Sequence, residues 1–269
     1  MSAAARAAHL LVDHEPFIFT DPLAARILGD RAPELLAYHH RMGSHPILSG
    51  ARTQAAVRSR YTEHRLAEAV GRDVTQYVIL GAGLDSFAYR NELGVRVFEI
   101  DHPDTQEWKR HQLESAGITL PENMTLAGVD FVKENLVLTE HGLDPAQPSF
   151  VSWLGVSMYL SREDIARTLA SLPPGTELVA DYMLPAELRD TAGDTYAEGL
   201  ATAAAERGEP WLSFFTPAEI SCLLAESGFT VISDVNQHDA IPATLWNRTD
   251  SLDPHVLSRL IHARRLTST

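Results

Sequence analysis

Cysteine is almost absent from this chain of 269 residues, which contains only Cys222. A single cysteine cannot form an intrachain disulfide or a cysteine-based metal cluster, and its place in an expected helix over 216–227 predicts a core position. The sequence also lacks a run of about 18 apolar residues, so it predicts no membrane span. The alanine-rich start has no signal-peptide features, and we therefore expect a cytoplasmic protein.

Positive charge is scarce as well, with 22 Lys and Arg against 36 Asp and Glu and a formal net charge of −14. Binding to nucleic acid or to an anionic membrane needs clustered cations that neutralise phosphates, so neither partner is expected. The length and a hydrophobic content of 45% suit one large domain over 1–269. Composition leaves the oligomeric state open.

The most informative stretch that is present runs from the apolar Tyr77-Val78-Ile79 into Leu80-Gly-Ala-Gly-Leu-Asp-Ser-Phe. An apolar run that ends in Gly-x-Gly predicts a strand that turns into a helix, with two positions where a ligand can approach the backbone closely. Glu99 and Asp101 end the next apolar run, about 20 residues later, where a doubly wound fold needs a carboxylate for ribose hydroxyls. Together the two features predict a nucleotide-like cofactor.

The third glycine of a dinucleotide site is missing, because Ser86 stands where Gly-x-Gly-x-x-Gly would place it. That glycine lets the helix pack closely and present its N-terminus to a pyrophosphate. With Asp85 directly before Ser86, the loop favours a ligand without phosphate, such as S-adenosylmethionine. NAD(P), FAD and a tight turn that binds nothing are the alternatives.

Three blocks carry a resemblance to a known family: residues 80–90 (LGAGLDSFAYR), 97–104 (VFEIDHPD) and 153–160 (WLGVSMYL). Together they resemble the leucine carboxyl methyltransferase family of class I S-adenosylmethionine-dependent methyltransferases, whose bacterial members include polyketide carboxyl O-methyltransferases. The likeness runs from about Arg6 to about Gly228. It implies a Rossmann-like α/β fold, S-adenosylmethionine as cofactor and S-adenosylhomocysteine as product.

The order of helical and strand patterns agrees with that fold. Helices are expected at 3–12, 22–28, 33–41 and 51–70, and strands at 75–80, 95–100, 124–129, 149–154 and 177–182, with helical segments between the strands. This alternation predicts a doubly wound, mostly parallel sheet. Segments 229–235 and 244–248 are expected to form a closing antiparallel hairpin. We divide the domain into a helical cap (1–70), a cofactor-binding core (71–182), a lid insertion (183–215) and a C-terminal part of the core (216–269).

In such sheets the ligand lies beyond the carboxyl ends of the strands. The residues expected there to contact the cofactor are Gly81, Ala82, Gly83, Glu99, Asp101, Asp130 and Phe131. The glycines would border the methionine part, and the resemblance favours Asp101 over Glu99 for the ribose. It also matches Asp130 and Phe131 to the adenine pair, although Asp130 could instead cap a helix over 131–137.

A cation is needed for the methionine carboxylate, and the resemblance places an arginine of the long helix on it, which aligns best with Arg58. The planar fork of arginine suits a carboxylate, while the alternative is an exposed helix face on which Arg58 pairs with Glu63. Arg6 is a weaker candidate for the same group. Leu154 stands where relatives of the eukaryotic enzyme have a cofactor-binding glutamate.

Residues near the reacting methyl are expected after the fourth strand and in the lid. Tyr159 is the candidate catalytic residue, as a hydrogen-bond partner of the acceptor, unless it only packs beneath the cofactor. The candidate substrate-binding residues are Tyr182, Met183, Tyr196, Trp211, Phe214 and Phe215. Aromatic side chains near a turn can form an apolar lid that excludes water, or simply the seam between lid and core.

The predicted reaction is an in-line displacement at the sulfonium methyl by a carboxyl group of a small secondary metabolite or a peptide terminus. A carboxylate is ionised at pH 7 and needs positioning more than a base, whereas a phenol would need one. We assign no general base, and His39, His40 and His45 lack the acidic residues of a metal site. A phenol O-methyltransferase, a non-catalytic protein that binds the cofactor, and an NAD-linked oxidoreductase are the alternatives.

Overall fold

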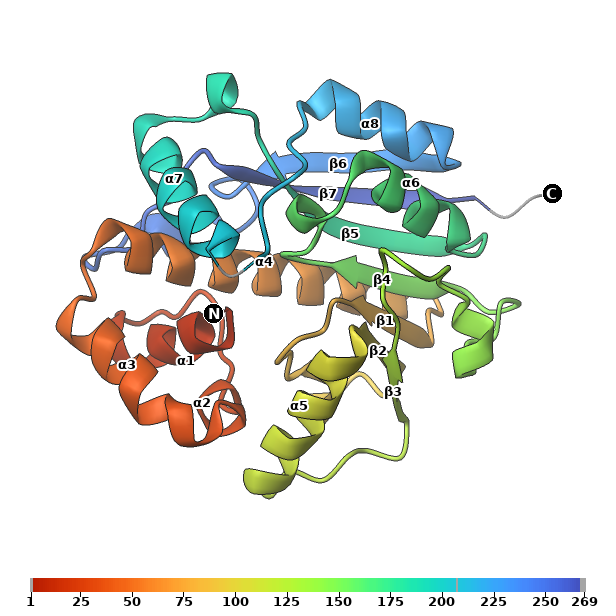
Figure 1. The fold of residues 1–269 in the computed structure, drawn as a ribbon, viewed down its shortest axis with the longest axis horizontal. Helices are drawn as coiled ribbons and strands as arrows, with labels where there is room; N and C mark the ends of the chain where they lie inside the picture. Colours follow the sequence, from red (N-terminus) through yellow and green to blue (C-terminus); the bar gives the residue numbers. More distant parts are fainter. Residues whose placement is uncertain (1, 207, 267–269) are drawn as a thin grey trace.

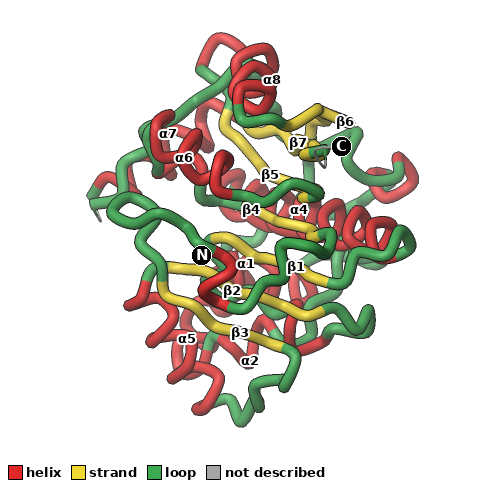
Figure 2. Tube along the Cα trace, turned by 90° about the vertical axis from the view of Figure 1, so that its right-hand side faces the viewer, coloured by secondary structure: helices red, strands yellow, loops and turns green. Residues whose placement is uncertain are grey.

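A seven-stranded sheet forms the centre of the computed structural model, which describes residues 2–206 and 208–266 (Figure 1). The strands are β1 (Gln76–Leu80), β2 (Arg96–Asp101), β3 (Met124–Gly128), β4 (Ser149–Trp153), β5 (Thr176–Met183), β6 (Phe229–Asn236) and β7 (Ser258–Arg265). Their order is β3-β2-β1-β4-β5-β7-β6, as Figure 2 shows. Strands β1 to β5 pair in parallel, and β7 runs antiparallel to β5 and β6. The predicted doubly wound α/β sheet is confirmed.

Helices cover both faces of this sheet. They are α1 (Ser2–Val12), α2 (Ala24–Ile27), α3 (Ala32–Arg41), α4 (Pro46–Val70), α5 (Pro103–Ser115), α6 (Arg162–Ser171), α7 (Thr191–Ala205) and α8 (Pro217–Glu226). Alternate strand residues point to opposite faces, so Val78 and Leu80 pack with α6 and α8 while Tyr77 and Ile79 pack with α4. This double burial explains the near-continuous apolar runs of the parallel strands.

The N-terminal helices pack on α4 and on the loop that follows β1. Buried alanines of α1 meet α2 and Leu84 of that loop in one apolar cluster, and α1 also lies along α4. Figure 1 shows the start of α1 near the middle of the molecule, between α4, α5 and α7. The cap is therefore placed to close the edge of the sheet at which β1 and β4 end.

The last strand is where the sequence-based assignment was wrong. Residues 244–246 belong to a short 3-10 helix (Ala243–Trp246), residues 247–248 have no regular structure, and the closing strand β7 is formed by Ser258–Arg265 instead. Four of its eight residues are basic, counting His262, so a hydrophobicity pattern does not reveal this strand. The structure neutralises them with acids of the neighbouring strands, as when Arg259 Nε donates to Asp234 Oδ1 at 2.7 Å.

Two expected helices are also absent from the described residues. The turn after β1 leads only to a 3-10 helix (Phe87–Arg90), because the Asp85 carboxylate accepts from the Phe87 N–H and holds a tight turn. The helix over 131–137 that Asp130 would have capped does not form, because residues 131–133 make a turn, residues 135–137 have no regular structure, and the Asp130 carboxylate accepts from the Val132 N–H.

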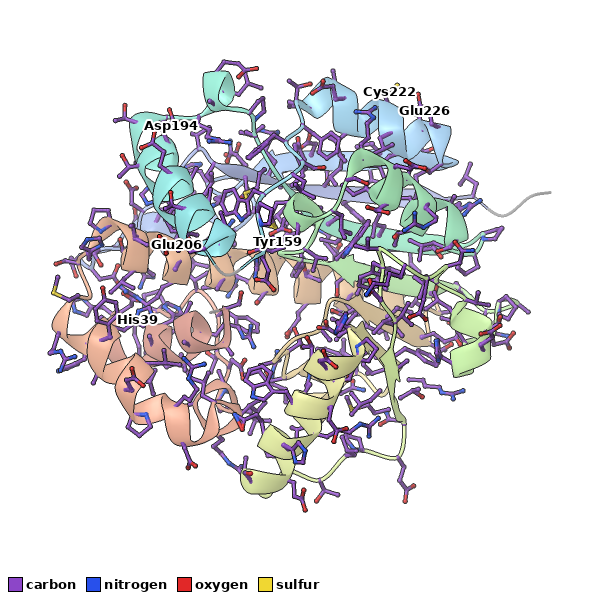
Figure 3. All side chains as sticks on the ribbon, viewed as in Figure 1. His39, Tyr159, Asp194, Glu206, Cys222 and Glu226 are labelled. Carbon is purple, nitrogen blue, oxygen red and sulfur yellow. The ribbon has the colours of Figure 1, made fainter. Side chains whose placement is uncertain are left out.

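Cys222 was expected in the core, but it lies on the exposed side of α8, where its Sγ contacts Glu226 (Figure 3). Helix α8 itself forms as expected, because Thr216 and Glu219 cap its start reciprocally. The buried face of α8 is made by Ile220, Leu223 and Leu224 instead.

Candidate cofactor and acceptor site

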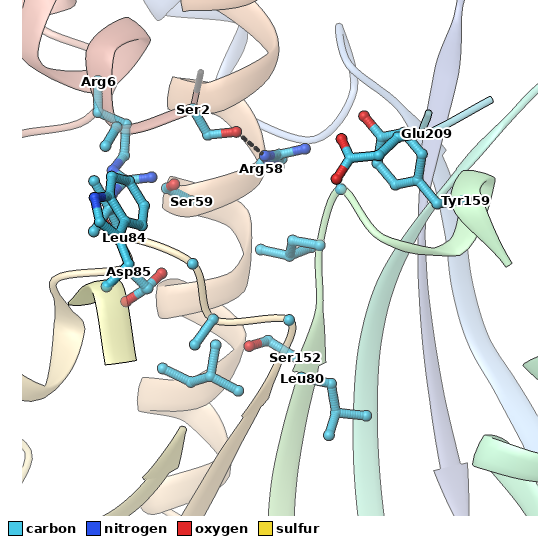
Figure 4. A pocket seen from close by; sticks show the side chains of 18 residues that line it. Ser2, Arg6, Arg58, Ser59, Leu80, Leu84, Asp85, Ser152, Tyr159 and Glu209 are labelled. Carbon is cyan, nitrogen blue, oxygen red and sulfur yellow. Dashed lines mark hydrogen bonds between the residues drawn. The ribbon is translucent and has the colours of Figure 1, made fainter. Parts of the chain in front are cut away.

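Two cavities adjoin at the carboxyl ends of β1 and β4. The first has a volume of about 350 Å³ and is lined by the loop of residues 81–85, by the end of β4 and by side chains of α1 and α4 (Figure 4). The second, of about 390 Å³, extends toward α3 and α7. The residues that line both are Ser2, Arg58, Gly155, Tyr159 and Glu209.

The loop after β1 forms one wall of the first cavity. Gly81 has a φ of +67°, and a Cβ there would lie 2.2 Å from Val156 Cγ2, so only glycine fits. Gly83 has a φ of +47°, but its missing Cβ would meet nothing within 4 Å. The Gly83 N–H donates to Asp101 Oδ2 at 2.5 Å, which ties the loop to the end of β2. The loop is closely packed at Gly81 and open at Gly83.

Arg58 enters the first cavity from α4, and a buried carboxylate holds it there. Its Nη1 donates to Asp181 Oδ2 at 3.0 Å, its Nη2 donates to Ser2 Oγ at 2.7 Å, and the other Asp181 oxygen accepts from the Gly155 N–H at 2.6 Å. The alternative pairing with Glu63 does not occur, because Glu63 binds Arg90. Sequence reasoning missed Asp181, although an acid inside the apolar strand β5 was a signal for it.

Arg6 is held in the same way by a second buried acid. Its Nε donates to Asp21 Oδ2 at 2.8 Å, and its Nη2 donates to the Leu84 carbonyl at 2.7 Å. Ser86, which stands where a dinucleotide site would have its third glycine, donates to Asp21 Oδ2 at 2.7 Å. Burial alone would raise the pKa of Asp21, but Arg6 and Ser86 together lower it, so the carboxylate stays ionised. This network fastens the helical cap to the glycine loop.

The predicted cofactor residues divide into two groups. Arg58, Gly81, Ala82, Gly83 and Leu154 line the first cavity. Of the remaining four, Asp101 lies at its border, where its side chain binds the N–H groups of Gly83 and His102. The ribose role of Asp101 stays a prediction.

Glu99 does not reach the cavity. It is fully buried and forms an ion pair with Lys109, whose Nζ also donates to the Asp85 carbonyl at 2.8 Å. Burial raises the pKa of Glu99, and Lys109 opposes that shift. Through Lys109 this ion pair is linked to the backbone of the glycine loop at Asp85. Glu99 therefore stabilises the loop and does not reach the ribose.

Asp130 and Phe131 follow β3 and lie outside the lining of the first cavity. The Asp130 carboxylate closes a turn and contacts Lys133 Nζ at 2.9 Å, which satisfies it locally. Phe131 is buried against Trp153, with ring centroids 6.5 Å apart. Their role at the adenine stays a prediction. Sequence reasoning also missed Trp108, an exposed side chain of α5 that lines this cavity.

Three of the six predicted substrate residues line the second cavity: Met183, Tyr196 and Trp211. Tyr182 does not, because successive residues of β5 point to opposite faces, and its hydroxyl donates to Asp234 Oδ2 at 2.7 Å. Phe214 is 37% exposed and packs on the outer side of Trp211, and Phe215 is part of the core.

Most of the second cavity was not anticipated from the sequence. Its further walls come from α3, α4, α7 and the end of the 3-10 helix after β4, with Leu35, Tyr38, His39, Ile47, Leu48, Ala51, Gln54, Ala55, Met158, Leu200, Ala203 and Ala204. The apolar faces of these helices were visible as patterns. Which of them face one another depends on how the helices pack, so no local signal identified the cavity.

Tyr159 and Glu209 stand where the two cavities meet (Figure 4). Tyr159 comes from the 3-10 helix Ser157–Tyr159 after β4, and Glu209 from the loop after α7. Glu209 makes no ion pair with a described residue, and it brings a negative charge close to the place where Leu154 offers none. A residue of the loop after α7 thus supplies an acid at the junction.

Comparison with known proteins agrees with this geometry. Residues 1–172 match the family model of leucine carboxyl methyltransferases. The "Putative S-adenosyl-L-methionine-dependent methyltransferase YktD" of Bacillus subtilis is 35% identical over 215 residues, which cover 77% of this chain and 70% of that protein. The chain belongs to the leucine carboxyl methyltransferase family. Its cofactor is S-adenosylmethionine, and methyl transfer is its class of reaction.

Other relatives and solved structures extend the comparison. A similarly named methyltransferase of Frankia alni is 33% identical over 67% of this chain and 59% of its own length. A DUF574 family protein from Streptomyces avermitilis has a TM-score of 0.63 at 17% identity, with 97% of both chains covered. A "putative methyltransferase" from Thermobifida fusca has a TM-score of 0.58 at 19% identity, with 90% of this chain and 94% of that one covered. These structures show the same class I fold.

The first cavity fits the cofactor of this family. A sulfonium-bearing amino acid needs a cation for its carboxylate, which Arg58 offers, and close access to backbone, which the open side of Gly83 offers. Within 2–206 and 208–266, no three histidine, cysteine or acidic side chains gather as metal ligands would, and no helix is long and apolar enough to cross a membrane.

Proposed function

We propose that this methyltransferase acts on oxygen, and that its acceptor is the carboxyl group of a small secondary metabolite or a peptide terminus. The observation that carries the proposal is the second cavity, a largely apolar chamber that opens onto the cofactor cavity beside Tyr159. Its size suits a small organic molecule or the end of a peptide.

Four residues would bind the cofactor and position the acceptor. Bound S-adenosylmethionine supplies an electrophilic methyl group. Arg58 would hold the methionine carboxylate, Asp101 the ribose hydroxyls, and the open side of Gly83 would admit the backbone contact. Tyr159, which lines both cavities, would orient the acceptor oxygen through its hydroxyl group.

The walls of the second cavity favour an acceptor that is already ionised. A carboxylate needs no base at neutral pH, and apolar walls strip the water that would weaken it as a nucleophile. His39 is a poor base in this cavity, because burial and Arg52 lower its pKa to about 4. Burial raises the pKa of Tyr196, which keeps that hydroxyl neutral.

A phenol is the second candidate acceptor, and Glu209 is the observation that favours it. This carboxylate lines both cavities, and among the described residues that line the second cavity it is the one acid that could accept a phenolic proton. The phenol alternative would make the reaction rate depend on Glu209 more strongly than the carboxyl alternative does.

The deciding experiment is turnover of labelled S-adenosylmethionine with matched sets of carboxylic acids and phenols. We expect methyl esters, which release methanol in mild alkali, whereas methyl ethers do not. Ether products would overturn the carboxyl assignment. Tight binding of S-adenosylhomocysteine without turnover of either set would favour a non-catalytic protein that binds the cofactor.

A further inference from the structure

Two ring N–H groups of the second cavity have no partner among the described residues. One is the indole Nε1–H of Trp211, which is buried, and the other belongs to His39 on α3. Two other buried polar groups of the cavity are paired, since the Tyr196 hydroxyl donates to Gln54 Oε1 and Gln54 Nε2 donates to Ser258 Oγ at 3.1 Å. Buried donors in native proteins are nearly always paired, so the buried Trp211 N–H indicates a ligand, and the His39 ring lines the same cavity.

Arg52 decides which nitrogen of His39 carries the proton. Arg52 is fully buried, its Nε donates to Asp13 Oδ2 at 2.8 Å, and its Nη1 lies 3.5 Å from His39 Nδ1. A guanidinium group can only donate, so Nδ1 must accept, and the proton of the neutral ring sits on Nε2. The lowered pKa of His39 keeps the ring neutral at pH 7. Its Nε2–H is therefore a fixed hydrogen-bond donor.

The His39 donor lies away from the place where the acceptor would be methylated. His39 lies on α3 at one side of the molecule, while Tyr159 lies near the carboxyl end of β4, and the two are well apart in Figure 3. A bound molecule that reaches both would have its methylated oxygen beside Tyr159 and another part beside His39. The remaining wall between them is mostly aliphatic.

We propose that the acceptor carries a second oxygen, a ketone or amide carbonyl away from the methylated carboxylate, and that His39 Nε2–H and Trp211 Nε1–H bind it. The proposal rests on the proposed function, which assigns the second cavity to the acceptor. The expected acceptor is therefore an oxygenated acid and not a plain fatty acid, because a hydrocarbon tail would leave the buried Trp211 N–H unpaired and give the His39 N–H no partner.

The first test uses matched acids on protein saturated with S-adenosylhomocysteine. Octanoate is compared with four oxo-octanoates, which carry a ketone at carbon 4, 5, 6 or 7. Binding is followed by nuclear magnetic resonance of the indole N–H groups, and the variant Trp211→Phe assigns the Trp211 signal. We expect at least one oxo acid to bind about three- to tenfold more tightly than octanoate and to shift the Trp211 signal downfield. Equal affinity for all five acids, or no binding of any, would overturn the proposal.

The second test distinguishes hydrogen bonding by the His39 N–H from packing of the His39 ring. In His39→Leu the preference for the oxo acid should fall to about twofold or less, whereas His39→Gln, which places an N–H near the same point, should retain most of it. His40→Leu, an exposed change on the same helix, is the control and should behave as wild type. An unchanged preference in a folded His39→Leu variant would argue against the His39 contact.

If His39→Leu does not fold, the nitrogen-15 spectrum of the wild-type His39 ring decides the matter, because a proton on Nδ1 contradicts the proposal directly. Failure of the inference also differs from failure of the proposed function. Equal methylation of octanoate and the oxo acids would reject the second oxygen and keep the carboxyl methyltransferase. Selective binding of an oxo acid that is never methylated would support the second oxygen and reject the carboxyl methyltransferase.

Discussion

The two cavities are similar in volume, about 350 and 390 Å³, but they are built in different ways. The first is formed by backbone at a glycine loop and by two arginines, each fixed by a buried carboxylate. The second is formed by side chains of α3, α4 and α7 that meet across a space. The comparison indicates that the first cavity has little tolerance for substitution, whereas the second can change its shape without loss of the cofactor.

The largest effect is expected for Gly81→Ala. The new Cβ would meet Val156 Cγ2 at 2.2 Å in a backbone of positive φ, which should cost about 3 kcal/mol or more of unfolding free energy and abolish binding of S-adenosylhomocysteine. Thermal unfolding and calorimetry measure both. Gly83→Ala is the control for stability, since its Cβ meets no protein atom within 4 Å and only strain of about 1 kcal/mol remains. Equal losses of unfolding free energy in the two variants would contradict this account of the loop.

Arg58→Met should weaken binding of S-adenosylhomocysteine by about ten- to a hundredfold, because it removes charge-assisted hydrogen bonds to the carboxylate. It should also lower stability, since Asp181 stays buried without its cation. Arg60→Met on the same helix is the control, because Arg60 donates to the Ile18 carbonyl and lines neither cavity. Calorimetry that shows equal affinity in the two variants would reject the role of Arg58.

Asp101→Ala should weaken cofactor binding by at least about 1 kcal/mol, through loss of hydrogen bonds to the ribose and release of the Gly83 N–H. Asp101→Asn separates the two causes, because an amide oxygen can still accept from Gly83 while the charge is gone. Unchanged affinity for S-adenosylhomocysteine in Asp101→Ala, measured by calorimetry, would leave the ribose without its expected ligand.

Leu200→Ala tests whether the second cavity can change its shape without loss of the cofactor, because this substitution enlarges only the second cavity. We expect the affinity for S-adenosylhomocysteine to stay within about twofold, while bulkier acceptors gain in kcat/KM relative to small ones. Leu188→Ala, at an exposed position outside both cavities, is the matched control. A large loss of cofactor affinity in Leu200→Ala would mean that the cavities are not independent.

The smallest effect on either cavity is expected from Glu177, which lies outside both. It accepts from Arg72, Arg264 and His262, and although burial opposes them, these partners lower its pKa to about 2. A carboxylate with a lowered folded-state pKa adds stability above about pH 4.5 that is lost as the pH falls toward 2. Urea unfolding between pH 6 and 3 should therefore show a weaker pH dependence in Glu177→Gln, with cofactor affinity at pH 7 unchanged.

The sequence predicted best where the evidence is local. Gly81, Gly83 and Asp101 were assigned from short motifs, and their geometry follows from strands that end side by side in a parallel sheet. The same reasoning failed for Asp181, because its partner Arg58 lies 123 residues away in the chain. It also failed for β7, whose basic residues look like a surface segment until Asp234 and Glu177 are seen beside them.

By itself, the amino-acid sequence determined the α/β architecture, the family and the glycine loop that lines the first cavity, because alternating apolar periods and a glycine turn act over a few residues. Only the tertiary structure decided which acid holds each arginine, that Glu99 braces the loop, and that α3, α4 and α7 enclose a second cavity. These outcomes depend on how distant segments pack, and the burial of a charge or a donor is set by all of its neighbours at once.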